Sequence, residues 1–323
     1  MPNLRYFPGV YAFNVTPSLR DGEAIDEAGL RRYIDYQIEA GVDGLTFFGS
    51  TGGIGLFSEE ERKTVARIAV EHAAGRAPVI FGIGSLSTSE SVRLAEFSQK
   101  IGVDGILVVP ISYWKPTTDE LFEHYKNIAS ASELPLIVYN NPATTGIDIA
   151  PDLLARLSEL ETVYHVKDSS GDISRPTLIR QMTGDRMLVW NGCDLATPQS
   201  FAGGAKGWGA GTASMIPRLC KTLYSLCIEM NDYAAAAAHF AKMLPLIQLM
   251  HVEGYIRVAH SALEIMGRSA GRPRRPIVCG RASHLDRQFR WSVGLDWGCR
   301  PEPSVQRQGR FLHDVDCVPS PPE

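Results

Sequence analysis

The chain has 323 residues, of which 44% are hydrophobic and 21% charged, a composition typical of a soluble globular protein able to bury a sizeable core. Its formal net charge of -4 provides no basic field, so neither nucleic acid nor an anionic membrane is an expected partner. The 6 cysteines form no Cys-x-x-Cys pair, which argues against a structural zinc site or a disulfide scaffold and favours reduced thiols in the cytoplasm. No signal segment and no membrane span of about 18 apolar residues is predicted. We therefore expect a cytoplasmic protein with a small-molecule partner.

Short apolar runs alternate with longer segments of helical period up to about residue 230, an order typical of a parallel α/β sheet. Eight strands, each followed by a helix in a little over 200 residues, predict a closed (β/α)8 barrel. An open sheet would instead show a glycine-rich turn after its first strand, and residues 15–18 (Val-Thr-Pro-Ser) do not form one. The predicted strands are residues 9–15, 44–49, 78–84, 105–110, 134–140, 163–167, 187–191 and 207–213. The predicted helices are residues 26–40, 58–74, 88–101, 117–130, 150–160, 174–182 and 194–202, with another from residue 216 onward.

Two local patterns support these boundaries. Residues 58–61 (Ser-Glu-Glu-Glu) form a capping box, in which the serine oxygen accepts from the third amide and the last glutamate reaches back. Residues 40–45 (Ala-Gly-Val-Asp-Gly-Leu) recur as residues 101–106 (Ile-Gly-Val-Asp-Gly-Ile). In both copies the first glycine ends a helix and the second enters a strand, so the repeat indicates tandem β/α units.

The chain divides into three parts. The barrel with the active site is predicted at residues 1–230, and a purely helical period predicts a small helical domain at residues 231–271. Residues 272–323 are an atypical tail rich in arginine, proline and cysteine. This tail has two interpretations, a disordered basic segment or a segment translated in a shifted reading frame.

Lys167 is the most informative residue of the chain. It closes the apolar run of residues 163–166, and a turn-and-cap sequence follows at residues 168–172. Burial removes the hydration of an ammonium group and lowers the pKa of a lysine, and a neutral amine is a nucleophile for a carbonyl. The alternative is a strand-end lysine that extends to solvent. Reactive groups of β/α barrels lie at the carboxyl ends of strands, which favours the nucleophile.

Two neighbouring strand ends carry groups that suit such a nucleophile. Tyr139 closes the preceding strand, and adjacent parallel strands are about 4.8 Å apart, so its phenol can act as a proton shuttle beside Lys167. The glycine-rich loop of residues 49–53 offers the hydroxyls of Ser50 and Thr51 together with free backbone N–H groups, which can bind a carboxylate.

The sequence contains no motif for metal catalysis or for a serine hydrolase. The 8 histidines show neither His-x-His nor His-Glu-x-x-His spacing, which gives metal catalysis little support. The hydrolase motif Gly-x-Ser-x-Gly is absent from the sequence as well.

These residues resemble the dihydrodipicolinate synthase / N-acetylneuraminate lyase family of pyruvate-dependent class I aldolases. The similarity covers about residues 8–276, with the motifs in the order of the family. The motifs are Gly49-Ser50-Thr51-Gly52, Tyr139-Asn140-x-Pro142-x-x-Thr145-Gly146, Val166-Lys167-Asp168-Ser169-Ser170-Gly171 and Asn191-Gly192-x-Asp194.

The resemblance implies a Schiff-base-forming lyase that acts on pyruvate or another 2-oxo acid and on a second aldehyde or sugar acid. It implies a barrel followed by three helices, assembled as a homotetramer (a dimer of dimers), with no metal and no organic cofactor. Lys167 is implied as the Schiff-base lysine and Tyr139 as the proton shuttle. Thr51 is implied as the relay to Tyr139, and Ser50 with Thr51 as the carboxylate-binding pair.

The resemblance also assigns two residues at the rim of the site. Tyr113 is implied as the tyrosine that reaches across a subunit interface, with Ser112 as the alternative because this loop is a residue longer than usual. Gly192 is implied to line the pocket.

Two departures from the family pattern bear on the substrate. Gly53 stands where the family's loop continues with a glutamate, and Thr144 stands where the synthases carry an arginine. A hydroxyl cannot replace a bidentate guanidinium, whose charge-assisted bonds contribute roughly 1.5 to 3 kcal/mol each. Thr144 favours a 2-keto-3-deoxy sugar-acid aldolase or dehydratase of the same family over the synthase. Together with Gly53 and the atypical tail it also leaves a metabolite-binding barrel without catalysis as an alternative. The tail, which stands where the family has its last helix, gives a third alternative, the inactive product of a damaged gene.

Overall fold

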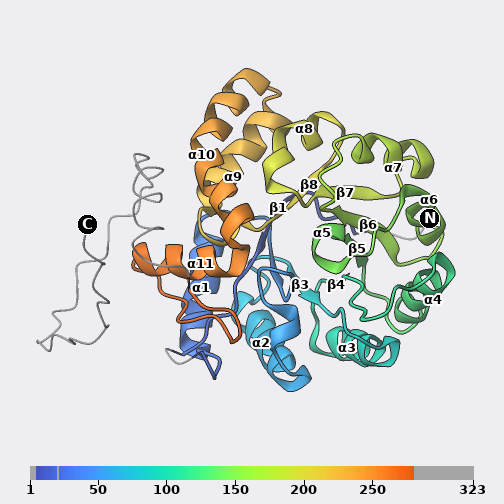
Figure 1. The fold of residues 1–323 in the computed structure, drawn as a ribbon, viewed down its shortest axis with the longest axis horizontal. Coiled ribbons are helices and arrows are strands. Elements are labelled where there is room, and N and C mark those ends of the chain that lie inside the picture. Colours follow the sequence, from blue (N-terminus) through green and yellow to red (C-terminus); the bar gives the residue numbers. More distant parts are fainter. Residues whose placement is uncertain (1–4, 20–21, 280–323) are drawn as a thin grey trace, which may run out of the picture.

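The computed structural model describes residues 5–19 and 22–279. Eight parallel strands form a closed barrel in the order β1 to β8, with helices around the outside (Figure 1). The predicted (β/α)8 barrel is therefore confirmed, and each predicted strand overlaps an observed one, although several observed strands end two or three residues earlier. The strands are β1 (Gly9–Phe13), β2 (Gly44–Phe47), β3 (Val79–Gly82), β4 (Gly105–Val108), β5 (Leu136–Asn140), β6 (Val163–Asp168), β7 (Leu188–Asn191) and β8 (Gly207–Ala210).

The helices that follow the strands also agree with the prediction, with two differences. A short helix, α5 (Pro142–Thr145), follows β5 and was not predicted. The predicted helix at residues 194–202 begins as a 3-10 turn, η2 (Asp194–Ala196), and becomes α8 (Thr197–Ala202) where Pro198 takes a first-turn position that needs no N–H donor. The others are α1 (Glu27–Glu39), α2 (Glu59–Ala73), α3 (Thr88–Ile101), α4 (Thr118–Ala129), α6 (Pro151–Leu157), α7 (Arg175–Thr183) and α9 (Pro217–Tyr224).

Three further short helical turns lie between these elements. The loop after β2 contains η1 (Ile54–Leu56), and the segment after β8 contains η3 (Thr212–Ser214). The predicted strand at residues 207–213 therefore ends at Ala210. A π-helical turn, η4 (Ser225–Glu229), follows α9.

The repeated sequence around residues 40 and 101 has a clear structural reason. Gly41 and Gly102 adopt φ angles of 84° and 80°, which end the preceding helices in the left-handed region. The aspartate of each copy accepts a hydrogen bond from the backbone of a neighbouring strand, Asp43 from Val10 and the second copy from Val79, both at 2.7 Å. The aspartate at the same place in each copy thus joins an αβ loop to the neighbouring strand.

Hydrophobic side chains form two layers. The larger layer lies between the strands and the surrounding helices, and the smaller one fills the inside of the barrel. Aromatic residues dominate the interior, where Tyr11 stacks on Trp190 with ring centroids 4.4 Å apart. The buried members of the interior cluster are Phe7, Tyr11, Phe13, Ile80, Leu107, Val109, Ile137, Tyr139 and Trp190. Tyr139 therefore belongs to both the interior cluster and the predicted site.

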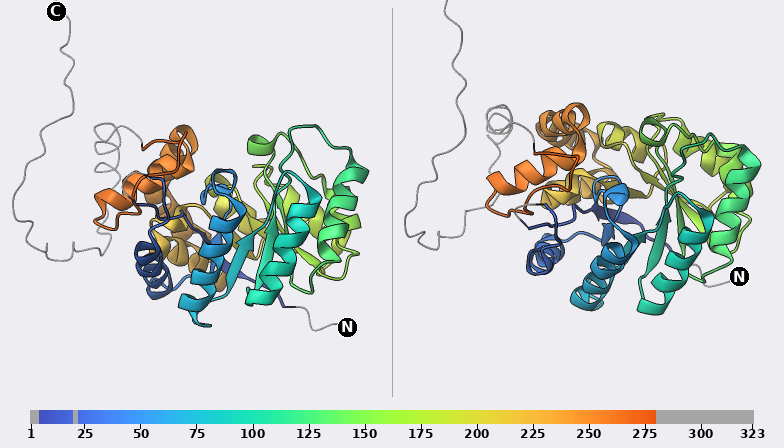
Figure 2. Two further views of the ribbon diagram at one scale, coloured as in Figure 1. Left: turned by 90° about the horizontal axis from the view of Figure 1, so that it is seen from below. Right: turned by 60° about the horizontal axis from the view of Figure 1, so that its bottom comes forward.

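Two long helices follow the barrel, α10 (Tyr233–Glu253) and α11 (Tyr255–Ile265). Gly254, with a φ angle of 96°, separates them. Helix α10 packs on η2, α8 and α9, and the orange helices of Figure 2 lie toward the end of the barrel opposite the N-terminus. None of the helices in the described part of the chain is long and apolar enough to cross a membrane.

The predicted tail at residues 272–323 falls outside the described residues from residue 280 onward. Its first residues pack on the barrel, because Arg274 donates to Glu61 at 2.6 Å and lies 4.8 Å from the ring centroid of Phe57. The disordered and frame-shifted interpretations of the rest stay predictions.

Candidate active site

A cavity of about 410 Å³ opens at the carboxyl ends of the strands. It combines the loop after β2 with β5, β6 and the loop after β7, and the C-terminal helices close one side. Six of the residues predicted from the sequence line this single cavity: Ser50, Thr51, Tyr139, Thr144, Lys167 and Gly192.

Lys167 enters the cavity from β6 and is only 4% exposed. Its Nζ atom lies 3.5 Å from the ring centroid of Phe13 and 4.2 Å from that of Tyr139, so aromatic faces surround the amine. Strand register places Tyr139 directly beside Lys167, as the sequence predicted. The amine is therefore held inside the barrel mouth and does not extend into bulk solvent.

The Tyr139 phenol is buried among polar partners. Its oxygen lies 3.3 Å from Ser50 Oγ and accepts a hydrogen bond from Asn141 Nδ2 at 3.0 Å. Burial alone would raise the pKa of this phenol, but the Lys167 ammonium and the hydrogen bond from Ser50 outweigh burial and hold the pKa below its ordinary value. A phenol with a lowered pKa beside an amine is suited to moving protons.

Two features of this network differ from the sequence prediction. Among the described residues, Ser50 Oγ lies within hydrogen-bond distance of the phenol, whereas no hydrogen bond joins Thr51 to Tyr139. Asn141 was missed, although its amide donates to both Tyr139 and Ser50, the latter at 3.2 Å. The motif already contained the adjacent Asn140, but sequence position does not reveal which amide turns toward the phenol.

Glycines make room for the Lys167 side chain. A Cβ added to Gly209 of β8 would lie 2.8 Å from Lys167 Cδ and Cε and from Phe13 Cε2. A Cβ added to Gly192 would lie 2.9 Å from Lys167 Cε and 2.1 Å from Ser169 Oγ. Gly209 of strand β8 and Gly192 therefore shape the space that the lysine side chain occupies.

Comparison with known proteins agrees with this geometry. The Dihydrodipicolinate synthetase family matches residues 6–288. The chain belongs to this family. The 4-hydroxy-tetrahydrodipicolinate synthase of Pelobacter propionicus is 35% identical over 272 residues, covering 84% of this chain and 93% of that protein. The synthase of Rhizobium meliloti is 36% identical over 273 residues, covering 84% and 92%.

Solved structures show the same relationship. The dihydrodipicolinate synthase from Acinetobacter baumannii, complexed with pyruvate, superimposes with a TM-score of 0.86 at 30% identity, covering 91% of this chain and all of that one (100%). The synthase from Aquifex aeolicus gives a TM-score of 0.86 at 28% identity, covering 91% and 100%. The predicted family is confirmed, and with it the predicted enzyme class, a Schiff-base-forming lyase of the class I aldolase type.

Within this member of the dihydrodipicolinate synthetase family, the buried carboxylates of Asp168 and Asp194 lie near the lysine, but both already accept hydrogen bonds from other residues. Asp168 accepts hydrogen bonds from Asn140 at 2.9 Å and from the Ser170 amide at 3.0 Å. Asp194 accepts from Trp208 at 2.8 Å and from Thr212, and its burial raises the pKa of its carboxyl group. These carboxylates stabilise the loops around the lysine and leave Tyr139 as the group best placed to move protons.

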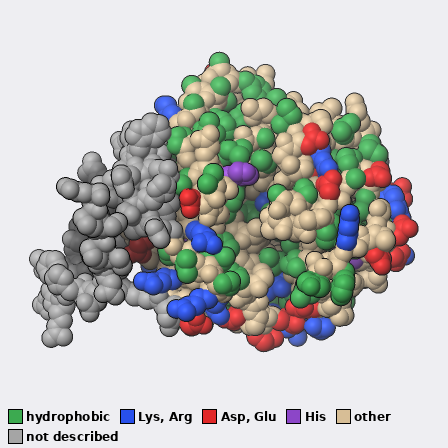
Figure 3. Space-filling view, in the orientation of Figure 1, with side chains coloured by type: hydrophobic (Ala, Val, Ile, Leu, Met, Phe, Trp, Pro, Cys, Tyr) green, Lys and Arg blue, Asp and Glu red, His purple; other side chains and the backbone are tan. Residues whose placement is uncertain are grey.

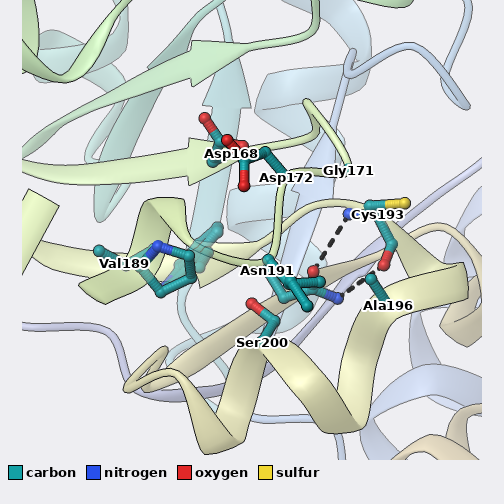
Figure 4. Close-up of a pocket in the computed structure, with 11 residues that line it drawn as sticks. Asp168, Gly171, Asp172, Val189, Asn191, Cys193, Ala196 and Ser200 are labelled. Carbon is teal, nitrogen blue, oxygen red and sulfur yellow. Dashed lines mark hydrogen bonds between the residues drawn. The ribbon is translucent and has the colours of Figure 1, made fainter. Parts of the chain in front are cut away.

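The loop after β7 is held by the last residue of that strand, Asn191 (Figure 4). Asn191 accepts a hydrogen bond from the Cys193 amide at 3.3 Å and donates to the Cys193 carbonyl at 3.0 Å. Between them, the Gly192 amide donates to the Asp168 carbonyl at 2.7 Å. This turn positions Gly192 against Lys167, in agreement with its predicted place in the pocket.

Tyr113 is the predicted site residue that lies elsewhere. Its side chain is 87% exposed, packs edge-on against Trp114 with ring centroids 5.2 Å apart, and does not line the cavity of its own chain. The alternative, Ser112, accepts a hydrogen bond from the Trp114 amide at 3.1 Å and is likewise outside the cavity. Neither residue contacts Tyr139 within one chain.

The C-terminal helices contribute a wall that the sequence did not predict. Tyr255, at the start of α11, lines the cavity and packs against Gly211, where an added Cβ would lie 2.6 Å from the tyrosine ring. The wall also includes Met250, His251 and Arg257. Among the described residues, no group of three or more histidine, cysteine, aspartate or glutamate side chains could hold a metal ion.

Proposed function

We propose that this protein forms an imine between Lys167 and pyruvate or a related 2-oxo acid. Lys167 Nζ attacks the C2 carbonyl carbon, and the carbonyl oxygen leaves as water after protonation. The protonated imine withdraws electrons from C3, so loss of a C3 proton gives an enamine that can attack an aldehyde. Reversal of the same steps cleaves the carbon–carbon bond and releases pyruvate.

The observation that carries this proposal is the paired position of Lys167 and Tyr139. The amine lies 4.2 Å from the Tyr139 ring, and the phenol is bound to Ser50 and Asn141. In the proposed mechanism Tyr139 moves protons to and from the substrate, and Ser50 relays them. Thr51 and the backbone N–H groups of its glycine-rich loop bind the carboxylate of the 2-oxo acid.

The choice of second substrate depends on Thr144, which stands where the synthases carry an arginine. Thr144 is an exposed hydroxyl on α5 and offers no cation at that position. An aldol condensation with an aldehyde and a cleavage or dehydration of a 2-keto-3-deoxy sugar acid both fit the imine. The pyruvate bound to the Acinetobacter baumannii relative supports pyruvate as the first substrate.

A turnover assay tests this function. Pyruvate consumption is measured with aldehyde acceptors and pyruvate release with 2-keto-3-deoxy acids, for the wild type and for Lys167→Arg. We expect turnover of at least one class by the wild type and none by the variant, which keeps the positive charge but not the nucleophile. Equal rates for the two proteins would contradict the proposal, and pyruvate binding without any turnover would favour the metabolite-binding barrel.

We also propose cytoplasmic location and assembly as a homotetramer, a dimer of dimers, in which Tyr113 completes the site of a neighbouring subunit. The exposed pair of Tyr113 and Trp114 supports such a contact, since two large aromatic side chains at 87% and 78% exposure favour burial in an interface. Sedimentation of the full chain should show a tetramer, and Tyr113→Ala should weaken assembly and lower turnover together. A monomer with full activity would contradict this arrangement.

A further inference from the structure

The charge of the active-site cavity is one-sided. Its lining includes the cations of Lys167 and Arg257 and the imidazole of His251, and it includes no aspartate or glutamate among the described residues. On the face shown in Figure 3, charged side chains gather mainly around the periphery, away from the centre. A cavity with two cations and no lining carboxylate favours an anionic occupant.

Arg257 has no partner in the described part of the chain. No ion pair or hydrogen bond joins its guanidinium to another described residue, although the side chain is partly buried. The neighbouring arginines differ, because Arg274 binds Glu61 at 2.6 Å and Arg268 lies 4.1 Å from the ring centroid of Tyr36. A guanidinium is always charged and presents paired donors that match a carboxylate.

The position of Arg257 is fixed by the backbone. Gly254, with a φ angle of 96°, ends α10 and lets α11 start in a new direction. The first residue of α11, Tyr255, packs against Gly211 just beyond β8. Arg257 lies in this anchored first turn. It therefore lines the cavity from α11, whereas Lys167 lines it from β6.

We propose that Arg257 determines specificity by binding a second carboxylate of the substrate, distinct from the carboxylate beside the reacting carbonyl. This inference rests on the proposed imine, which fixes the first carboxylate beside Ser50 and Thr51. The remainder of the substrate then faces the α11 wall, where Arg257 is the available cation. Substrates with an anionic distal end are preferred over substrates of the same length with an apolar end.

The test measures imine formation directly and needs no turnover. The full chain is reduced with borohydride in the presence of 2-oxoglutarate or 2-oxoadipate, and in parallel with 2-oxopentanoate or 2-oxohexanoate, which match them in length but lack the second carboxylate. Mass spectrometry gives the concentration of each acid at half-maximal labelling of Lys167. The proteins are the wild type, Arg257→Gln, Arg257→Lys and the control Arg268→Gln, which removes a cation outside the cavity.

In the wild type, we expect at least one dicarboxylate to reach half-maximal labelling at a concentration about 10-fold lower than its matched monocarboxylate. A difference of about 10-fold is what one charge-assisted contact contributes. Arg257→Gln should remove this preference, Arg257→Lys should retain part of it, and Arg268→Gln should leave it unchanged. Pyruvate should still label Lys167 in all four proteins, because it has no second carboxylate for Arg257 to bind.

The outcomes separate this inference from the proposed function. If pyruvate labels Lys167 but the wild type shows no dicarboxylate preference at either length, or Arg257→Gln keeps it, Arg257 has no such role. If pyruvate fails to label the wild type, the imine mechanism and the inference built on it are both wrong.

Discussion

Replacement of Gly209 by alanine should slow imine formation without unfolding the barrel. The new Cβ would lie 2.8 Å from Lys167 Cδ and Cε and from Phe13 Cε2. Carbon atoms normally pack about 3.5 to 4.0 Å apart, so the overlap is roughly 0.7 to 1.2 Å. Strand β8 pairs with β1 at this residue, Tyr11 opposite Gly209, so the side chains must move rather than the backbone.

The size of the effect follows from this overlap. A displacement of about 1 Å of a reacting group lowers the rate by about 100-fold, whereas overpacking a core costs about 1 to 3 kcal/mol of folding free energy. The rate of Lys167 labelling by pyruvate and borohydride should therefore fall by about two orders of magnitude, while urea unfolding still shows a cooperative transition. Gly55→Ala is the matched control, because a Cβ there meets nothing within 4 Å. Labelling of Gly209→Ala at the wild-type rate would show that the space beside Gly209 does not limit the position of Lys167.

Four further substitutions probe the site and the interior. Tyr139→Phe should slow but not abolish Lys167 labelling and should lower turnover by about 10²- to 10⁴-fold, and full turnover would contradict its role as proton shuttle. Ser50→Ala should lower kcat more than Thr51→Ala, because Ser50 Oγ lies 3.3 Å from the phenol; the reverse order in steady-state kinetics would favour the relay predicted from sequence. Burial lowers the pKa of His165 from 6.5 to about 3, so the unfolded chain binds a proton that the folded chain does not as the pH falls below 6.5. Its contribution should lower the free energy of unfolding by about 2 kcal/mol between pH 7 and pH 5. His165→Gln keeps an acceptor for the Phe7 amide and should reduce that loss in urea titrations; an unchanged loss would contradict the assignment.

The sequence was informative wherever a local rule determines the structure. Alternating apolar and helical segments predicted the barrel, and strand ends at Tyr139 and Lys167 predicted their pairing, because the register of neighbouring parallel strands follows from where the strands end. The capping box at Ser58 is present as predicted, with Ser58 Oγ accepting from the Glu61 amide at 3.3 Å.

The sequence was less informative where side-chain direction or long-range packing decides the contact. Ser50 and Thr51 are adjacent, so only the turn after β2 determines which hydroxyl meets the phenol. Asn141 lies just outside β5, where the period of the strand no longer fixes its direction. Arg257 is 90 positions from Lys167 along the chain (257 minus 167), and its place in the cavity depends on the packing of two helices rather than on any local pattern.

The central claim is that Lys167 is the imine-forming residue. It is tested most directly by reduction of the full chain with borohydride in the presence of pyruvate, followed by digestion and peptide mapping by mass spectrometry. We expect one pyruvate-derived adduct per chain, located on Lys167 and absent when pyruvate or borohydride is omitted. An unmodified Lys167, or an adduct located on another lysine, would contradict it.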